Sequence, residues 1–194
     1  MLEIRADGLA DVLTGQEKPS VPVLLTVRAQ AEGGLRIFAE GERVALARRL
    51  LPMAVALDWE IAFMEEAADL LAEAKARGIA VIASAHDFEK TPDIALLRQM
   101  EQNARSLGAD VVKFAFRLNS YEDMQVGIEL LRGATGPMAV MGMGALGPVS
   151  RLVYAQHGSV LTYGYLGNVP TAPGQWSADQ FRAALTQLPL ISAK

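Results

Sequence analysis

The sequence predicts an α/β fold in which parallel strands form a TIM-type (β/α) barrel. Short apolar segments with the composition of buried strands alternate with amphipathic helical segments along nearly the whole chain, and this order is typical of a parallel sheet. Charged side chains recur near the C-terminal ends of several strand segments. Glycines and helix-capping residues mark many of the boundaries between segments.

Seven segments have the apolar composition of short strands. They cover residues 2–5, 21–28, 53–60, 78–86, 109–116, 137–142 and 159–166. Segment 109–116 is almost continuously apolar, as expected of a strand that is covered on both faces. After Asp110 near its start, Lys113 is the charged side chain that interrupts the apolar residues 111–116.

Helical segments occupy the intervals between these strands. They cover residues 38–51, 61–77, 93–107, 120–132 and 148–157, with a last one at 177–188. Ser120 and Ser177 stand where N-caps are expected, and Gly78 and Gly108 follow helices as C-terminal glycines do. The connection 6–20 has room for only a turn or two of helix.

The position of the polar residues distinguishes a barrel from a doubly wound open sheet. Side chains alternate between the two faces of a strand, so each strand segment can be divided into two faces. One face carries polar side chains near the C-terminal ends of four strands: Glu3, Arg5, Arg28, Ser84, His86 and Lys113. A barrel builds its active site at that end, whereas an open sheet has no reason to place charge there so often. We therefore favour the barrel.

The strand count is one short of a complete eight-stranded barrel. Because the first strand already carries polar residues of the predicted site, we expect the first βα unit to be the one that is lacking. An open barrel leaves strand edges unpaired, which favours self-association. We expect a single catalytic domain over residues 1–194 and a homodimer.

The composition excludes several classes of protein. The chain is 51% hydrophobic and 21% charged, as in a globular protein. Its net charge of −4 argues against general nucleic-acid binding, and the absence of cysteine removes disulfides and thiolate metal sites. Neither a secretory signal nor an apolar stretch long enough for a membrane span is found. We expect a cytoplasmic protein that binds neither nucleic acid nor membrane.

Lys113 is the leading candidate for a catalytic residue. Burial disfavours the charged form of a lysine and leaves an amine that can attack a carbonyl. A lysine that reaches the strand end or closes an ion pair is the alternative. His86 can transfer protons near neutral pH or make a structural hydrogen bond. The second histidine, His157, is late in a helix, so no metal site is expected.

Further candidates are anion-binding groups and loops. Arg5, Arg28 and Arg151 carry guanidinium groups suited to a carboxylate, although each could instead form a salt bridge. Residues 142–147 match the dinucleotide fingerprint G-x-G-x-x-G. They follow the sixth strand rather than the first, so we expect a loop over the site and no cofactor. Residues 171–175, after the last strand, are a candidate lid.

Seven motifs, in order and at compatible spacing, resemble those of the type I 3-dehydroquinate dehydratases of the shikimate pathway. They are EIRAD at 3–7, TVR at 26–28 with EGG at 32–34, DWE at 58–60, SAHDF at 84–88 with TP at 91–92, VKFA at 112–115, SRL at 150–152 and APGQ at 172–175. The resemblance covers nearly the whole chain. It implies a barrel enzyme of aromatic amino acid biosynthesis that dehydrates 3-dehydroquinate to 3-dehydroshikimate without a metal or organic cofactor.

The resemblance also implies residue roles. Lys113 forms a Schiff base with the substrate ketone. His86 removes the proton from the adjacent carbon and then protonates the departing hydroxyl, so that water leaves in a syn sense, and Glu32 orients His86. The remaining members of the site bind the substrate carboxylate and ring hydroxyls: Glu3, Arg5, Arg28, Arg151, Thr171 and Gln175.

The chain departs from the family pattern at two places. Thr171 stands where serine is common, which keeps the hydroxyl. Family members carry a βα unit before the Glu-x-Arg strand, whereas here only Met1 and Leu2 precede Glu3. This difference leaves one alternative function, a truncated, weakly active or inactive paralogue that binds a hydroxylated cyclic acid or a partner protein without turnover. A lysine aldolase that acts on a phosphorylated sugar is a third interpretation.

Overall fold

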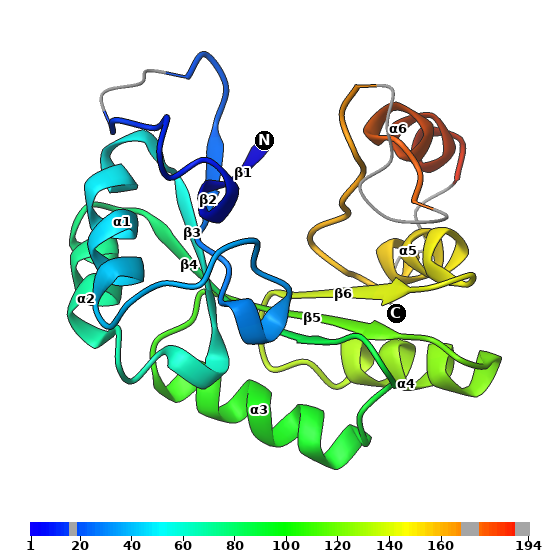
Figure 1. Ribbon diagram of the computed structural model, residues 1–194. Helices are drawn as coiled ribbons and strands as arrows, with labels where there is room; N and C mark the ends of the chain where they lie inside the picture. Colours follow the sequence, from blue (N-terminus) through cyan, green and yellow to red (C-terminus); the bar gives the residue numbers. More distant parts are fainter. Residues whose placement is uncertain (16–18, 168–174, 189–194) are drawn as a thin grey trace. The chain divides into compact units, whose positions relative to one another are not determined.

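The computed structural model describes residues 1–15, 19–167 and 175–188. Its six strands form one sheet in the order β1-β2-β3-β4-β5-β6 (Figure 1). Their bounds are β1 Leu2–Arg5, β2 Val23–Thr26, β3 Ala56–Glu60, β4 Ala80–Asp87, β5 Val111–Arg117 and β6 Met138–Met143. Each strand follows its predecessor without the reversal of order that a doubly wound sheet has. The predicted α/β barrel class is confirmed by this topology.

Helices separate most of the successive strands. Their bounds are α1 Glu42–Leu50, α2 Ala68–Ala76, α3 Ile94–Ser106, α4 Tyr121–Arg132, α5 Gly147–Gln156 and α6 Ala178–Gln187. Four short 3-10 helices join them: η1 Ala6–Gly8, η2 Gln30–Glu32, η3 Leu51–Met53 and η4 Ile61–Phe63. No helix in these ranges combines the length and the apolar character that a membrane span requires.

Six of the seven predicted strands are present, and the seventh, at 159–166, is wrong. In the described part of this segment, the backbone forms a single isolated bridge, between Tyr165 and Ser177. The Val140 N–H donates to the Ser159 hydroxyl oxygen at 3.0 Å. In a paired strand, a backbone carbonyl would accept this hydrogen bond instead. Side-chain hydroxyls compete with a ladder in this way.

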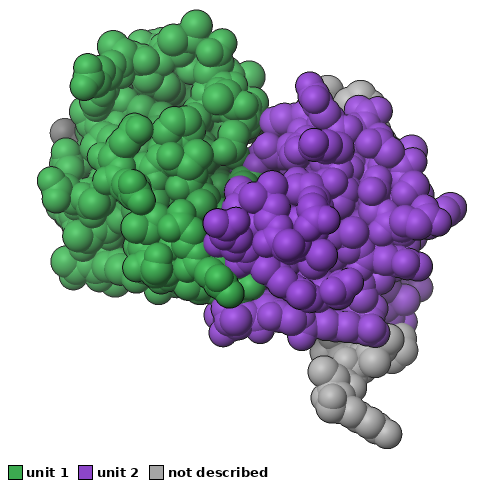
Figure 2. Space-filling view, turned by 90° about the horizontal axis from the view of Figure 1, so that it is seen from below, with its two compact units in different colours: residues 1–85, 101–112 green, residues 86–100, 113–194 purple. Residues whose placement is uncertain are grey.

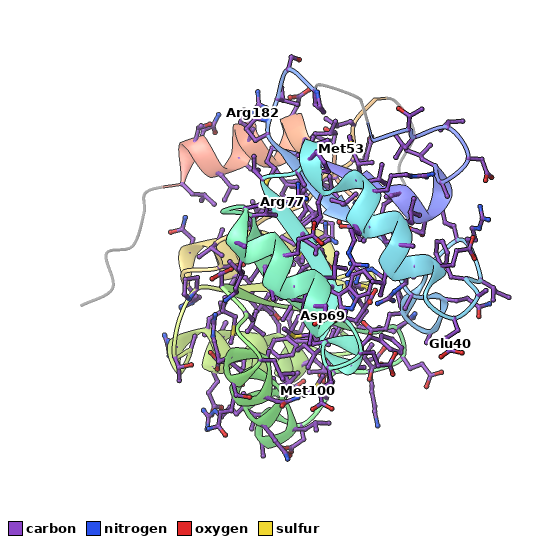
Figure 3. The ribbon with its side chains drawn as sticks, turned by 90° about the vertical axis from the view of Figure 1, so that its left-hand side faces the viewer. Glu40, Met53, Asp69, Arg77, Met100 and Arg182 are labelled. Carbon is purple, nitrogen blue, oxygen red and sulfur yellow. The ribbon has the colours of Figure 1, made fainter. Side chains whose placement is uncertain are left out.

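Two predicted helices begin later than expected. The predicted helix at 38–51 begins only at Glu42, because Gly41 before it has a left-handed φ of 73°. The helix predicted at 61–77 is interrupted: η4 comes first and α2 begins at Ala68. In α2, Asp69 lies in the first turn and Arg77 directly follows the last residue (Figure 3). The negative charge near the N-terminus and the positive charge near the C-terminus both interact favourably with the helix dipole.

The chain divides into two compact units, coloured separately in Figure 2. Unit 1 comprises Met1–Ala85 and Glu101–Val112, and unit 2 comprises His86–Met100 and Lys113–Lys194. In unit 1 every residue of β2 and β3 is buried, and β1 pairs with β2 in parallel register, Arg5 opposite Thr26.

The core of unit 2 is centred on β6 and the two helices that contact it. The fully buried ring of Tyr154, on α5, reaches α4, where its hydroxyl donates to the Met124 carbonyl at 3.3 Å. Gly127 on α4 gives this ring its space, since a Cβ there would lie 2.5 Å from Tyr154 Cζ. Tyr154 therefore fixes how α4 and α5 pack.

Candidate active site

The predicted site residues fall into two groups, one in each unit. Unit 1 holds Glu3, Arg5, Arg28 and Glu32, and unit 2 holds His86, Lys113, Arg151 and Gln175. Thr171 lies outside the described residues, as does the rest of the predicted lid except Gln175.

Arg28 is the centre of a buried polar network in unit 1. Its side chain is 3% exposed, and Nη2 donates to Asp58 Oδ1 at 2.8 Å. Nη1 donates to Glu60 Oε1 at 3.0 Å and to Ser84 Oγ at 2.7 Å, while Ser84 Oγ donates to Asp58 Oδ1 at 2.6 Å. Burial alone would lower the pKa of Arg28, but the two carboxylates outweigh it and raise the pKa above its usual value. Arg28 therefore remains charged.

Glu60 connects this network to the loop that carries Glu32. Besides Arg28, Glu60 Oε1 accepts the Ala29 N–H at 2.8 Å, and Glu60 Oε2 lies 2.7 Å from Arg43 Nη1. Ala29 is the N-cap of η2, whose last residue is Glu32. A buried carboxylate with several donors is held rigidly, so Glu60 fixes the start of the turn that positions Glu32.

The two glycines after Glu32 each have a structural reason. Gly33 ends η2 with a left-handed φ of 86°, a conformation that favours glycine. Gly34 packs against the preceding backbone so closely that a Cβ would lie 2.3 Å from the Arg28 carbonyl oxygen. The EGG motif therefore lets the loop fold back onto Arg28, the second residue after β2.

The polar side chains of β1 are held by neighbouring hydrogen bonds. Glu3 Oε1 accepts from Thr26 Oγ1 on β2 at 2.8 Å. Arg5 donates from Nε and Nη2 to the two carboxylate oxygens of Asp7, at 2.9 and 2.8 Å. Its Nη2 also donates to the Gly33 carbonyl at 3.0 Å. This bidentate pair fixes the Arg5 guanidinium next to the Glu32 loop.

Asp7 is a buried carboxylate that holds the same loop through backbone hydrogen bonds. It is 2% exposed and accepts the N–H groups of Leu35 at 2.9 Å and Arg28 at 3.3 Å. Burial alone would raise the pKa of Asp7, but the hydrogen bonds from Arg5 and from these amides hold the pKa below its usual value. Asp7 is therefore ionised at neutral pH.

Sequence reasoning did not assign roles to Asp7, Asp58 and Glu60, which are partners of the predicted arginines. The signal for two of them was present, because Asp58 and Glu60 alternate with Trp59 on β3 and all three are buried. Acidic residues two apart on a buried strand share one face and need a cationic partner.

Lys113 is the third residue of β5, belongs to unit 2 and is 4% exposed. Its neighbours Val112 and Phe114 are also buried. The Nζ atom lies 4.7 Å from the centroid of the Tyr163 ring, within the range of a cation–π interaction. The structure therefore places the amine in an apolar strand against an aromatic face, as predicted for its burial.

Arg151, on α5, differs from the arginines of unit 1 in its partners. It forms no ion pair with any residue in the described ranges, and its buried Nε has no hydrogen-bond partner there. Its Nη1 donates to the Tyr163 carbonyl, and its guanidinium carbon lies 5.9 Å from the Phe181 ring centroid. Burial lowers the pKa of Arg151 with no carboxylate to oppose it. These features suit an arginine that receives an anionic ligand.

His86 is near the end of β4, and the loop after it is tied to the end of β5. The His86 and Phe88 rings are nearly parallel, with centroids 6.4 Å apart. Thr91 Oγ1 donates to the Arg117 carbonyl at 2.8 Å, and Asn119 Nδ2 donates to the Glu89 carbonyl at 3.0 Å. These two bonds hold the His86 loop to the strand that carries Lys113.

The glycine-rich segment at 142–147 covers the end of β6, a short turn and the first residue of α5, and packing explains its glycines; the prediction that it lies over the site stays a prediction. A Cβ on Gly142 would lie 2.3 Å from Ser150 Oγ, and Gly144 has a left-handed φ of 84°. These glycines allow the turn between β6 and α5. Within the described ranges, no group of three or more acidic, histidine or cysteine side chains is arranged to hold a metal ion.

Comparisons with known proteins agree with the resemblance seen in the motifs. Residues 1–191 match the model of a family described as type I 3-dehydroquinase. The 3-dehydroquinate dehydratase of Methanosarcina barkeri is 34% identical over 97% of this chain and 85% of its own length. That of Thermococcus gammatolerans is also 34% identical, over 97% of this chain and 87% of its own length.

Solved structures of similar proteins share the fold. The crystal structure of 3-dehydroquinate dehydratase from Geobacillus kaustophilus superposes with a TM-score of 0.87 at 30% identity, covering 100% of this chain and 82% of that chain. A type I 3-dehydroquinate dehydratase from Clostridium difficile, solved with covalently modified comenic acid, gives a TM-score of 0.78 at 29% identity over 85% of this chain and 68% of that chain.

Proposed function

Because this chain belongs to the type I 3-dehydroquinase family, we propose that it dehydrates 3-dehydroquinate to 3-dehydroshikimate through a Schiff base on Lys113. The observation that carries the proposal is the position of Lys113, 4% exposed within an apolar strand. A lysine in such surroundings is suited to attack a carbonyl. The relative solved with a covalently modified ligand supports covalent chemistry in the family.

The elimination follows from these groups in four steps. The Lys113 amine attacks the ketone carbon, and loss of water gives an iminium. Because the iminium withdraws electrons, the C–H next to it becomes acidic, and His86 removes that proton. The resulting enamine expels the neighbouring hydroxyl, which His86 protonates, so that one water leaves. Hydrolysis of the remaining iminium releases the enone product and restores the amine.

Arg151 is the group that we assign to the substrate carboxylate. Its guanidinium has no carboxylate partner among the described residues, whereas Arg28 and Arg5 are already paired. Gln175 and Thr171 are proposed as further carboxylate ligands from the family resemblance. We propose that the ring hydroxyls bind to Glu3, Arg5 and Arg28. The hydrogen-bond donors and acceptors available for this are those that the ion pairs and hydrogen bonds within the protein do not use.

Glu32 is proposed, from the family resemblance, to orient His86 and to stabilise its charged form. The anchoring of its turn by Glu60 supports a fixed position for this carboxylate. No metal or organic cofactor is needed by this mechanism, since the lysine iminium supplies the electron sink.

A homodimer in the cytoplasm is also proposed. In the sheet of the described residues, β1 is the first strand in the order and pairs with β2, and a free strand edge favours self-association. Light scattering after size-exclusion chromatography tests this proposal. A mass of one chain at micromolar concentration would contradict it.

Turnover of 3-dehydroquinate, followed by the absorbance of the enone product, tests the proposed activity. Lys113→Met should remove activity, whereas Lys75→Met should leave it unchanged, because Lys75 is exposed and contacts only Asp110 at 3.7 Å among its described ion pairs. Arg151→Gln should raise KM about 10- to 100-fold, the loss expected for a charged hydrogen bond. Binding of substrate without turnover would contradict the proposal and support the inactive-paralogue alternative.

A further inference from the structure

Tyr163 contacts both of the proposed substrate-handling cations of unit 2. Its ring lies over Lys113, with 4.7 Å between Nζ and the ring centroid. Its carbonyl oxygen accepts a hydrogen bond from Arg151 Nη1. The segment that carries Tyr163 is the one that the sequence misassigned as a strand. A single residue therefore joins the amine proposed to bind the ketone to the guanidinium proposed to bind the carboxylate.

The ring of Tyr163 faces an atom that bears positive charge during the reaction. Lys113 Nζ is cationic as an ammonium and again as the protonated iminium. A buried cation loses hydration, and an aromatic face within about 6 Å of it replaces part of that stabilisation. The same face restricts the directions that the flexible lysine side chain can take.

We propose that Tyr163 is a positioning residue. Its ring holds Lys113 Nζ and stabilises the iminium formed there. Its carbonyl oxygen holds Arg151 at a distance from Lys113 that suits the distance between the ketone and the carboxylate of the substrate. The inference rests on the proposed Schiff base at Lys113. It extends that function by assigning the aromatic ring to the chemical steps and the backbone to substrate binding.

The two contacts can be separated by mutation because one uses the side chain and the other uses the backbone. Tyr163→Leu removes the ring and keeps the carbonyl that Arg151 binds. We expect kcat to fall about 2- to 30-fold, as cation–π energies imply, while KM changes less than twofold. Tyr163→Phe keeps the aromatic face and should retain a kcat within twofold of the parent enzyme.

Phe181→Leu is the matched variant for the aromatic contact of Arg151. It removes the ring beside Arg151 and leaves Tyr163 in place. We expect KM to rise and kcat to remain within twofold. A thermal unfolding midpoint is measured for every variant, so that loss of folded protein is distinguished from loss of catalysis.

A substitution of nearly equal shape tests the electrostatic part even if Tyr163→Leu does not fold. Pentafluorophenylalanine at position 163 keeps a flat ring but reverses the charge distribution that attracts a cation. In single-turnover experiments with borohydride quenching, the rate at which the Lys113 adduct forms should fall at least as much as for Tyr163→Leu, relative to Tyr163→Phe.

The outcomes discriminate clearly between this inference and the proposed function. An unchanged rate with pentafluorophenylalanine, or an increase in KM without a decrease in kcat for Tyr163→Leu, would overturn the role of the ring. A fall for Tyr163→Phe as large as for Tyr163→Leu would overturn it too, because the hydroxyl would then carry the effect. Absence of any adduct in the parent enzyme would instead reject the Schiff base itself.

Discussion

The Nζ atom of Lys113 lies 4.7 Å from the centroid of the Tyr163 ring. Arg151 likewise contacts an aromatic ring, that of Phe181, whereas Arg28 in unit 1 is bound by the carboxylates of Asp58 and Glu60. A carboxylate neutralises a buried cation, but an aromatic face stabilises the charge without cancelling it. Arg151, which forms no ion pair within the described ranges, thus retains the charge that a substrate carboxylate needs.

The Arg28–Asp58 pair should be essential for the stability of unit 1. Asp58→Ala removes one of the two carboxylates that pair with the buried Arg28 guanidinium and leaves Glu60 in place, and the loss of a buried charged hydrogen bond costs about 1.5 to 3 kcal/mol of unfolding free energy. Asp179→Ala is the control, because its 3.9 Å contact with Arg182 is exposed on both sides. Urea unfolding should show a large loss for the first variant and less than about 0.5 kcal/mol for the second. Equal stabilities would disprove a structural role for the network.

Asp7 should make the stability of the protein depend on acid pH. Because the pKa of Asp7 is lowered in the folded protein from an ordinary value of 3.8, its contribution is fully present above the unfolded pKa. The contribution is lost as the pH falls through the folded pKa, since the unfolded chain then binds the proton more readily. Asp7→Asn should be less stable at pH 7 by about 1.5 to 3 kcal/mol.

The measurement is urea unfolding of both proteins between pH 7 and pH 2.5. The difference in unfolding free energy between parent and Asp7→Asn should shrink as the pH falls below 3.8, the ordinary pKa of the side chain. A difference that stays constant with pH would show that the ionised form of Asp7 has no special stabilisation.

Gly127 should tolerate no larger side chain while Tyr154 is present. In Gly127→Ala the new Cβ would lie 2.5 Å from both Tyr154 Cζ and Tyr154 Oη. Overpacking costs about 1 to 3 kcal/mol, and the better helix propensity of alanine returns about 1 kcal/mol. We expect a net destabilisation of up to about 2 kcal/mol by these opposing effects.

Gly133→Ala at the C-terminal end of the same helix is the control for that prediction. A Cβ there would lie no closer than 3.6 Å to its neighbours, an ordinary contact, so the stability should change little. If Gly127→Ala melts at or above the temperature of Gly133→Ala in calorimetry, the packing of Tyr154 against α4 is not tight.

Local chemistry allowed much of the fold to be predicted. The strand at Leu2–Arg5 was placed correctly, and Ser120 and Ser177 form the N-terminal caps that were expected, each within a capping box. Such signals depend on a few adjacent residues. The strand predicted at 159–166 was wrong because the prediction used local signals alone. Its apolar pattern does not show that the Ser159 hydroxyl binds a backbone N–H.

The site was predicted less completely, because its supports are long-range. Arg28 meets Asp58 and Glu60 across 30 and 32 positions of the sequence, and single-sequence patterns do not pair residues at such separations. Lys113 was found because a charge in an apolar strand is unusual. The roles of the individual site residues, and the expectation of one catalytic domain, remain predictions.

Covalent trapping tests the central claim most directly. The protein is incubated with 3-dehydroquinate, reduced with borohydride and analysed by mass spectrometry of the intact chain and of its peptides. We predict one reduced adduct per chain, located at Lys113 and absent from Lys113→Met. Turnover without any adduct, or an adduct on another lysine that Lys113→Met retains, would contradict the account.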